Sequence, residues 1–172
     1  MMDTSLLQSC DILLYKGTDL TSHLIQWGTN SPYNHAAVVV DPQKNLAIES
    51  NTGHQMGVRA LDLRKLDDKE IDVYRIRPGW AYDPDKTISY LVSCLGAPYD
   101  FGGVLWLGVL KLLHLKDHSN KWQKDKDYFC SELCYAAFNA GGLDIVPQVG
   151  EADVTSPGDI SRSERIEKIA LK

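Results

Sequence analysis

The stretch from Asp127 to Gly142 predicts a helix that begins with a cysteine. Asp127 is placed to cap its first turn, and Gly141 stands where helices commonly end. The N–H groups of a first helical turn have no partners within the helix and together carry roughly half a positive charge. Because a thiolate is stabilised there, the pKa of Cys130 is expected to lie below that of free cysteine. Cys130 is therefore a candidate nucleophile, and burial as a small apolar side chain is the alternative.

The composition argues against two classes of function. The chain has 172 residues, of which 44% are hydrophobic and 24% charged, as in a single folded domain with a substantial core. Its net charge of −5 is opposite in sign to the basic excess of most nucleic-acid-binding domains. The longest apolar run, residues 104–115, is too short to span a bilayer. We therefore expect neither a nucleic-acid partner nor a transmembrane segment.

The cysteines are expected to be free thiols. Cys130 and Cys134 lie one helical turn apart, and a disulfide between them would be strained. No sequence pattern pairs Cys10 with Cys94. Residues 1–11 lack the basic start and the apolar core of a signal peptide. Free thiols without a signal peptide predict a reducing, cytoplasmic location, and export by another route stays open.

The hydrophobic pattern predicts an α+β domain in which several antiparallel strands precede most of the helices. Strands are expected at 11–15, 35–40, 46–50, 58–63 and 71–76. Helices are expected at 18–27, 84–95, 104–115 and 130–140, and a short charged helix is expected to begin at Ser161. The polar residues 116–127 predict a flexible insertion in a single domain that spans 1–172.

His35 differs from the other histidines because it begins a strongly apolar strand, where a polar side chain is costly without a partner. If Val40 pairs with Lys44 in a hairpin, His35 lies directly opposite Glu49 on the same face of the sheet. The neighbours of His35 on that face are then the small residues Ala37 and Ala47. The other face is expected to be apolar core, formed by Ala36, Val38, Val40, Leu46 and Ile48.

Cys130, His35 and Glu49 supply the three parts of a thiol hydrolase. Cys130 would attack an acyl carbon, His35 would move the proton as general base, and Glu49 would fix the tautomer of the ring. The backbone N–H of Cys130, joined by a side-chain donor, would hold the oxyanion. The alternative for His35 is a structural hydrogen bond at the open end of the hairpin.

Two motifs around these residues resemble the NlpC-type branch of papain-like cysteine hydrolases. Residues 96–103, Gly-Ala-Pro-Tyr-Asp-Phe-Gly-Gly, match the family's Gly-x-Pro-Tyr-x-x-Gly-Gly loop, and Cys130-Ser131 matches its helix start. In the ordinary family the histidine strand follows the cysteine helix, whereas here His35 precedes it. This order resembles the circularly permuted members, the YiiX-like amidases. Further segments are similar to that group, namely Asn34-His35, Glu49, 129–133 and 156–159.

The resemblance implies a circularly permuted papain-like fold, with a central antiparallel sheet packed against helices. It implies cysteine amidase or peptidase activity through an acyl-enzyme, without a cofactor or metal. The expected substrates are small peptides, cell-wall fragments or N-acyl compounds. It also places Tyr99 near the nucleophile, and we assign substrate binding or support to Tyr33, Asn34 and Ser131.

The chain departs from the family at two places. Cys10 stands where relatives often carry a glycine before Asp-Ile. The spacer between Gly103 and Cys130 is longer than the usual family loop, which puts the mode of substrate access in doubt.

Three alternatives stay open for this chain. A zinc site at Cys130 and Cys134 lacks a second Cys/His pair at the usual short spacing. His114 and His118 are also four residues apart, but the helix is expected to fray between them, and Cys134 is expected in the core with Phe138. A lipid-directed acyltransferase or esterase of the lecithin:retinol acyltransferase type would allow peripheral lipid contact through 104–115, but its nucleophile motif is usually Asn-Cys-Glu. A non-catalytic binding module on the same fold would typically lack a triad residue, and none is missing.

Overall fold

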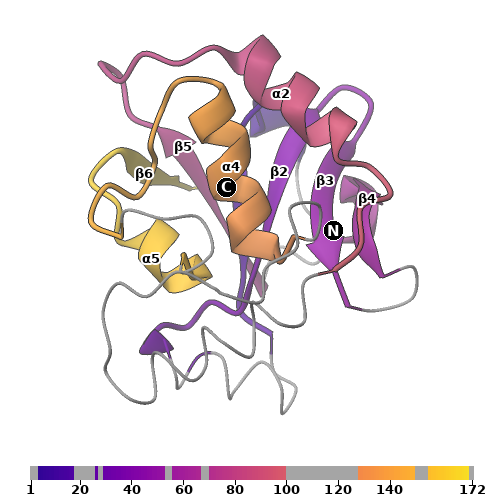
Figure 1. Cartoon of the computed structure of the whole chain (residues 1–172), viewed down its shortest axis with the longest axis horizontal. Coiled ribbons are helices and arrows are strands. Elements are labelled where there is room, and N and C mark those ends of the chain that lie inside the picture. Colours follow the sequence, from indigo (N-terminus) through magenta and orange to yellow (C-terminus); the bar gives the residue numbers. More distant parts are fainter. Residues whose placement is uncertain are drawn as a thin grey trace.

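The computed structural model describes residues 4–17, 26, 29–52, 56–66, 70–99, 128–149 and 155–170 (Figure 1). Its centre is a six-stranded sheet in the order β4-β3-β2-β1-β5-β6, in which neighbouring strands are antiparallel. The strands are β1 (Ile12–Tyr15), β2 (His35–Asp41), β3 (Leu46–Asn51), β4 (Gly57–Asp62), β5 (Ile71–Ile76) and β6 (Ile166–Ile169). The helices are α2 (Pro84–Ser93), α4 (Cys130–Ala140) and α5 (Pro157–Ser161), with 3-10 turns η1 (Thr4–Leu6) and η2 (Leu63–Lys65). These elements confirm the expected α+β class with a central antiparallel sheet.

Helix α4 lies across the front of the sheet against β2 and β3, with α2 beside it (Figure 1). The larger core fills this interface, and strand residues alternate into it as a pleated strand requires. Its strand members include Ile12, Leu14, Ala36, Val38 and Ile48. Val40 belongs to the same core and Leu46 packs against it, so the predicted apolar face of the hairpin is confirmed.

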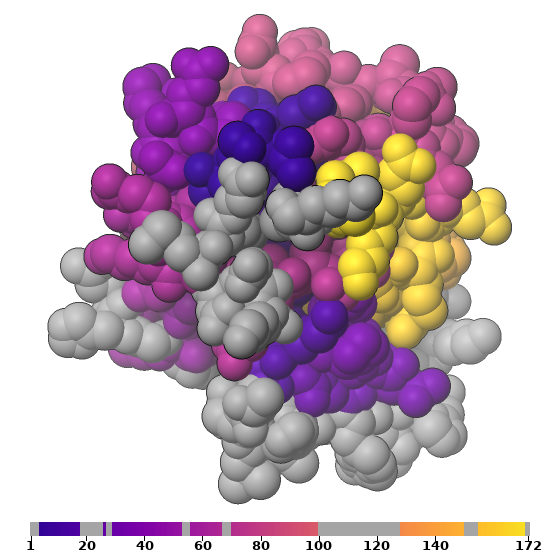
Figure 2. Space-filling view, turned by 180° about the vertical axis from the view of Figure 1, so that it is seen from behind, coloured from indigo at the N-terminus to yellow at the C-terminus, as the bar shows by residue number. Residues whose placement is uncertain are grey.

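A second, smaller core lies on the other face of the sheet. It includes Leu7, Leu13, Ala37, Val39 and Ala47. Figure 2, seen from behind, shows the N-terminal residues in indigo and the C-terminal residues in yellow on this side. The expected position of Ala37 and Ala47 on one face is confirmed, and that face is itself largely buried.

The strand predictions agree with the structure to within one residue at each end, but the end of the chain does not follow its prediction. A charged helix was expected from Ser161, where the structure has the end of α5 followed by strand β6. β6 pairs with β5 at the edge of the sheet and buries Ile166. Pairing with a neighbouring strand therefore outweighed the local helical tendency. The predicted helices 18–27 and 104–115 and the insertion 116–127 lie in or extend into parts of the chain outside the described residues.

The register of the β2–β3 hairpin differs from the predicted one. Glu49 lies opposite Ala37 rather than His35, and the register shifts between Val39 and Asp41. The predicted pairing of Val40 with Lys44 is therefore wrong. The residues after β2 form a longer turn instead, in which the Lys44 N–H donates to Asp41 Oδ1 at 3.1 Å. Because the difference is two residues, the predicted face of each side chain is unchanged.

Both ends of α4 differ in detail from the prediction. Phe129, not Asp127, is the N-cap, and its N–H donates to Glu132 Oε2 at 3.3 Å. Gly141 is the C-cap with a helical φ of −76°, while Gly142 takes the left-handed φ of +88°. A Cβ on Gly141 would lie 2.2 Å from Thr87 Oγ1, so glycine is required there for the close approach of α2.

Candidate active site

Cys130 is the first residue of α4 and lies against the start of β2. Its sulfur accepts hydrogen bonds from the backbone N–H groups of Ser131 and Ala36 and from the ring of His35. Burial by itself raises the pKa of a thiol, but the charge of His35 and these donors outweigh it. The pKa of Cys130 is therefore lowered, as the helix-start position predicts.

His35, the first residue of β2, connects the thiol to a carboxylate. Its Nε2 atom lies 2.8 Å from Glu49 Oε2, and its ring meets the ring of Tyr15 edge-on with centroids 5.0 Å apart. The side chain is 16% exposed. Burial lowers the pKa of a histidine, but Cys130 and Glu49 together exceed this effect and raise the pKa of His35. The cationic form of the ring is thus favoured between two anionic partners.

Glu49 is almost completely buried, with 2% of its side chain exposed. Besides His35, it accepts hydrogen bonds on Oε1 from Arg59 Nε at 2.9 Å, from Arg59 Nη2 at 2.8 Å and from Asn51 Nδ2 at 3.1 Å. Burial raises the pKa of a carboxyl, but His35 and Arg59 reverse this and hold it at about 2. Glu49 is therefore ionised throughout the neutral range.

Arg59 and Asn51 were not predicted from the sequence. Arg59 lies directly opposite Glu49 in the β3–β4 pair, and directly opposite residues share a face. The alternation of side chains along β4 places Arg59 on one face of the sheet. It points to Glu49 only when the register of β4 against β3 is known.

Three proposed support residues are held by structural hydrogen bonds. The hydroxyl of Tyr33 donates to Asp72 Oδ2 at 2.5 Å, and the side chain is buried. Asn34 Oδ1 accepts from the Gly17 N–H at 2.6 Å. Ser131 is fully buried, and its Oγ donates to the carbonyl of Thr155 at 2.7 Å. These contacts fix the chain around His35 and Cys130, and substrate binding by the three residues stays a prediction.

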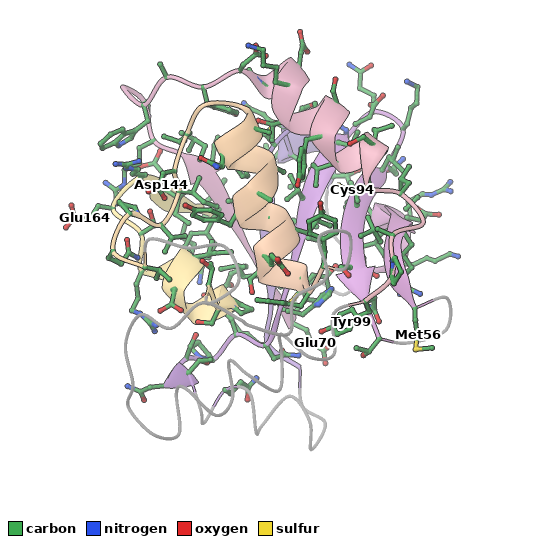
Figure 3. The ribbon with its side chains drawn as sticks, viewed as in Figure 1. Met56, Glu70, Cys94, Tyr99, Asp144 and Glu164 are labelled. Atoms are coloured by element: carbon green, nitrogen blue, oxygen red, sulfur yellow. The ribbon has the colours of Figure 1, made fainter. Side chains whose placement is uncertain are left out.

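Tyr99 lies in a segment that is tied to the start of α4. The carbonyl of Pro98, the preceding residue, accepts from the Tyr128 N–H at 3.1 Å. Ala97 is bonded in turn to Val58 at 2.9 Å, near the start of β4. In Figure 3, Tyr99 lies below β3, in the lower part of the view where α4 begins. The backbone before Tyr99 is thus tied to the start of α4, and a role for Tyr99 in the site stays a prediction.

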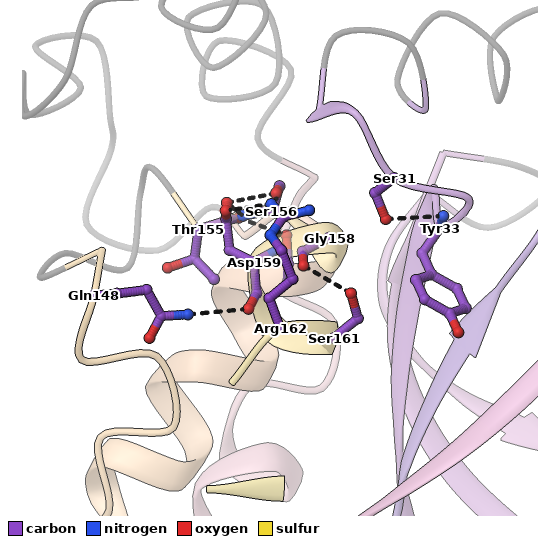
Figure 4. A network of polar contacts seen from close by, with 10 residues as sticks. Ser31, Tyr33, Gln148, Thr155, Ser156, Gly158, Asp159, Ser161 and Arg162 are labelled. Atoms are coloured by element: carbon purple, nitrogen blue, oxygen red, sulfur yellow. Dashed lines mark hydrogen bonds and ion pairs between the residues drawn. The ribbon is translucent and has the colours of Figure 1, made fainter. Parts of the chain in front are cut away.

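Helix α5 lies between α4 and the segment that leads into β2 (Figure 4). Ser156 and Asp159 cap its first turn reciprocally: Ser156 Oγ accepts from the Asp159 N–H at 3.2 Å, and Asp159 Oδ2 accepts from the Ser156 N–H at 3.0 Å. Thr155, just before the cap, accepts the Ser131 hydroxyl. A Cβ on Gly158 would lie 2.5 Å from Ser31 Cβ, so only glycine fits this contact.

The remaining cysteines behave as buried thiols. All four cysteines are free, as expected. Burial raises the pKa of Cys10 to about 11 and also raises that of Cys134. Cys134 lies in the larger core together with Phe138, as expected. Cys130 is thus set apart from Cys10 and Cys134 by the direction of its pKa shift.

The comparisons with known proteins bear on the fold. No family model and no curated protein matches the chain. The crystal structure of the metalloprotein YiiX from Escherichia coli O157:H7 superposes with a TM-score of 0.69, at 19% identity, over 96% of this chain and 97% of that chain. The chain has a YiiX-like fold. The resemblance noted in the sequence is consistent with this likeness over nearly the whole length.

Two further features of the described residues bear on the site. Among these residues, no three His, Cys, Asp or Glu side chains are grouped so that they could hold a metal ion. None of the helices within the described ranges is long and apolar enough to cross a membrane.

Proposed function

We propose that the protein is a cysteine hydrolase that cleaves amide bonds through an acyl-enzyme on Cys130. The observation that carries this proposal is the continuous set of contacts from the Cys130 thiol through the His35 ring to the buried Glu49 carboxylate. A lowered thiol pKa, a raised histidine pKa and an ionised orienting group are the properties that a thiol nucleophile needs. The YiiX-like fold supports the proposal only at the level of architecture.

Acylation uses the proton that His35 holds. Because His35 Nε2 faces Glu49, Nδ1 is the ring nitrogen left for the thiol. The thiolate attacks the carbonyl carbon, the new C–S bond forms, and the negative charge on oxygen is held by the Cys130 N–H at the start of α4. The C–N bond then breaks, and the leaving amine takes the proton from His35.

Deacylation reverses the proton movement. Neutral His35 takes a proton from water as the water oxygen attacks the thioester carbon. The C–S bond breaks, a carboxylic acid leaves, and Cys130 and His35 return to the ion pair. Glu49 keeps Nε2 protonated in both steps, since an ionised carboxylate only accepts hydrogen bonds. Small peptides, cell-wall fragments and N-acyl compounds are the proposed substrates.

The name of the YiiX structure raises a metal-dependent alternative. The described residues around Cys130 do not fit a metal centre. Cys130 and His35 would supply two donors, but both oxygens of the neighbouring Glu49 already accept hydrogen bonds from His35, Arg59 and Asn51. The described residues also contain no group of three potential ligands. No step of the mechanism is therefore assigned to a metal.

Selective labelling of the thiols tests the proposal. The protein is treated with a single equivalent of iodoacetamide at about pH 6, and the label is located by peptide mass spectrometry. We expect rapid labelling of Cys130 in the wild type and slow labelling in His35→Ala, with the other three cysteines as internal references. Cys130→Ala and His35→Ala should both abolish turnover of an amide substrate. If Cys130 labels no faster than the other cysteines, or His35→Ala keeps full activity, the proposal is wrong.

A further inference from the structure

We infer that Arg59 is a positioning residue of this site, which acts on His35 by holding Glu49 ionised and in a fixed orientation. The inference rests on the proposed function, because it assigns a role in the same set of contacts. It concerns a residue outside the three that were expected from the sequence.

The two oxygens of the Glu49 carboxylate have different hydrogen-bond partners. Arg59 places both Nε and Nη2 on Oε1 of Glu49, at 2.9 and 2.8 Å. Asn51 donates to the same oxygen. Oε2 is thus left to His35, at 2.8 Å. Because Oε1 is held by several donors, the carboxylate cannot rotate without losing them, and the His35 ring is oriented indirectly by Arg59.

The charge of Arg59 acts on the same carboxylate. Glu49 is 2% exposed, and a carboxyl at that depth without a cationic partner tends to take up a proton. Arg59 is 27% exposed and stays charged over the pH range of an assay. A protonated Glu49 would no longer stabilise the imidazolium of His35, and the Cys130 thiolate would in turn lose its counter-ion.

Groups from four strands contribute to this balance. His35 faces it from β2, Arg59 from β4 and Asn51 from β3 itself. Tyr15 faces it from β1, where burial first and then the charge of Glu49 raise the pKa of the phenol. Among these groups and within the described residues, Arg59 is the cation whose charge does not depend on the state of Cys130.

The test measures the labelling rate of Cys130 against pH in Arg59→Gln, in Arg59→Lys and in the control Arg75→Gln. Arg59→Gln removes the charge but keeps hydrogen-bond donors, and Arg59→Lys keeps the charge but loses the paired geometry. We expect Arg59→Gln to move the acid limb of the profile upward by about one pH unit, so that labelling at a pH below the midpoints of both proteins is about tenfold slower. The difference should shrink toward pH 8, and Arg59→Lys should lie between wild type and Arg59→Gln.

Arg75→Gln is a closely matched control. Arg75 pairs with Asp11 through Nε and Nη2, both at 2.7 Å, and the side chains are 25% and 1% exposed. This buried pair lies at the other end of β1 from Tyr15 and His35. Arg75→Gln should therefore lower the midpoint of thermal unfolding about as much as Arg59→Gln and leave the pH profile of labelling unchanged.

The outcomes separate the two proposals. Slow labelling of wild-type Cys130 would overturn the proposed function itself. A normal wild-type profile that Arg59→Gln shifts no more than Arg75→Gln does would overturn the role of Arg59 alone. If Arg59→Gln does not fold, Arg59→Lys decides, because a profile identical to wild type contradicts a role for the paired geometry.

Discussion

The Nε2 atom of His35 lies 2.8 Å from Glu49 Oε2, although the strand register pairs Glu49 with Ala37. The two side chains are thus diagonal neighbours on one face of the β2–β3 hairpin, a separation that a long side chain spans. The contact occupies Nε2 and leaves Nδ1 toward Cys130. In the proposed mechanism, the hairpin therefore selects both the tautomer of His35 and the direction in which its proton moves.

Glu49→Gln should lower kcat/KM without abolishing activity. The amide oxygen can still accept the Nε2 proton of His35, but it no longer stabilises the imidazolium by charge. We expect a loss on the order of 10²-fold, near the lower limit for a positioned acid–base group. Steady-state rates on an amide substrate, or the labelling rate of Cys130, measure this loss. A Glu49→Gln variant as inactive as His35→Ala would show that Glu49 does more than orient the ring.

Glu49 should also contribute to stability against acid. Its pKa is 4.5 in the unfolded chain and about 2 in the fold, so this contribution is fully present above pH 4.5 and is lost as pH falls toward 2. The shift corresponds to about 3 kcal/mol of the free energy of unfolding. Urea unfolding of wild type and Glu49→Gln between pH 2 and 6 measures the effect, and the variant should show the shallower dependence on pH. Parallel curves for the two proteins would contradict the assignment.

The pairing of His35 with Glu49 could be predicted from the sequence, because it depends on which face of the sheet each side chain occupies more than on the exact strand register. An error of two residues in the β2–β3 pairing kept His35 and Glu49 on one face, whereas an error of one would have separated them. The shift between Val39 and Asp41 leaves no clear mark in the sequence. The position of Cys130 at a helix start was likewise predicted correctly, although Phe129 replaced Asp127 as the N-cap.

Other features depended on contacts between distant segments. Arg59 reaches Glu49 only through the β3–β4 register, and β6 exists because β5 offers an edge. The position of Cys10 is explained by local backbone geometry instead. Its φ of +68° is the left-handed conformation that glycine adopts most easily. The glycine of the resembling family at this position therefore has a backbone explanation, which this sequence alone did not provide.

Tyr33→Phe should lower stability and leave the reactivity of Cys130 unchanged. The Tyr33 hydroxyl bonds Asp72 at 2.5 Å and the Tyr74 hydroxyl at 2.9 Å, so it belongs to the structure beneath the site. Loss of a hydrogen bond to a charged group costs about 2 kcal/mol. Urea unfolding and the labelling rate of Cys130 measure the two effects. Slower labelling at unchanged stability would instead assign Tyr33 to the chemistry.

Tyr90→Phe is the matched control for that variant. The Tyr90 hydroxyl bonds the Tyr128 hydroxyl at 3.0 Å, a contact between two neutral groups. We expect the smaller loss of about 1 kcal/mol in the free energy of unfolding. A larger loss for Tyr90→Phe than for Tyr33→Phe would contradict the importance given to the Asp72 contact.

Gly158→Ala should disturb the site through Ser31 rather than through the chemistry of the triad. The added Cβ would lie 2.5 Å from Ser31 Cβ and 2.9 Å from Ser31 Oγ, so α5 and the segment leading to His35 must move apart. Overpacking of this kind costs about 1–3 kcal/mol, and we expect slower labelling of Cys130 as well. Ser31→Gly in the same chain removes the clash, so the double variant should recover most of both losses. A double variant as impaired as Gly158→Ala alone would contradict this prediction. It would show that the close contact between Gly158 and Ser31 does not position His35.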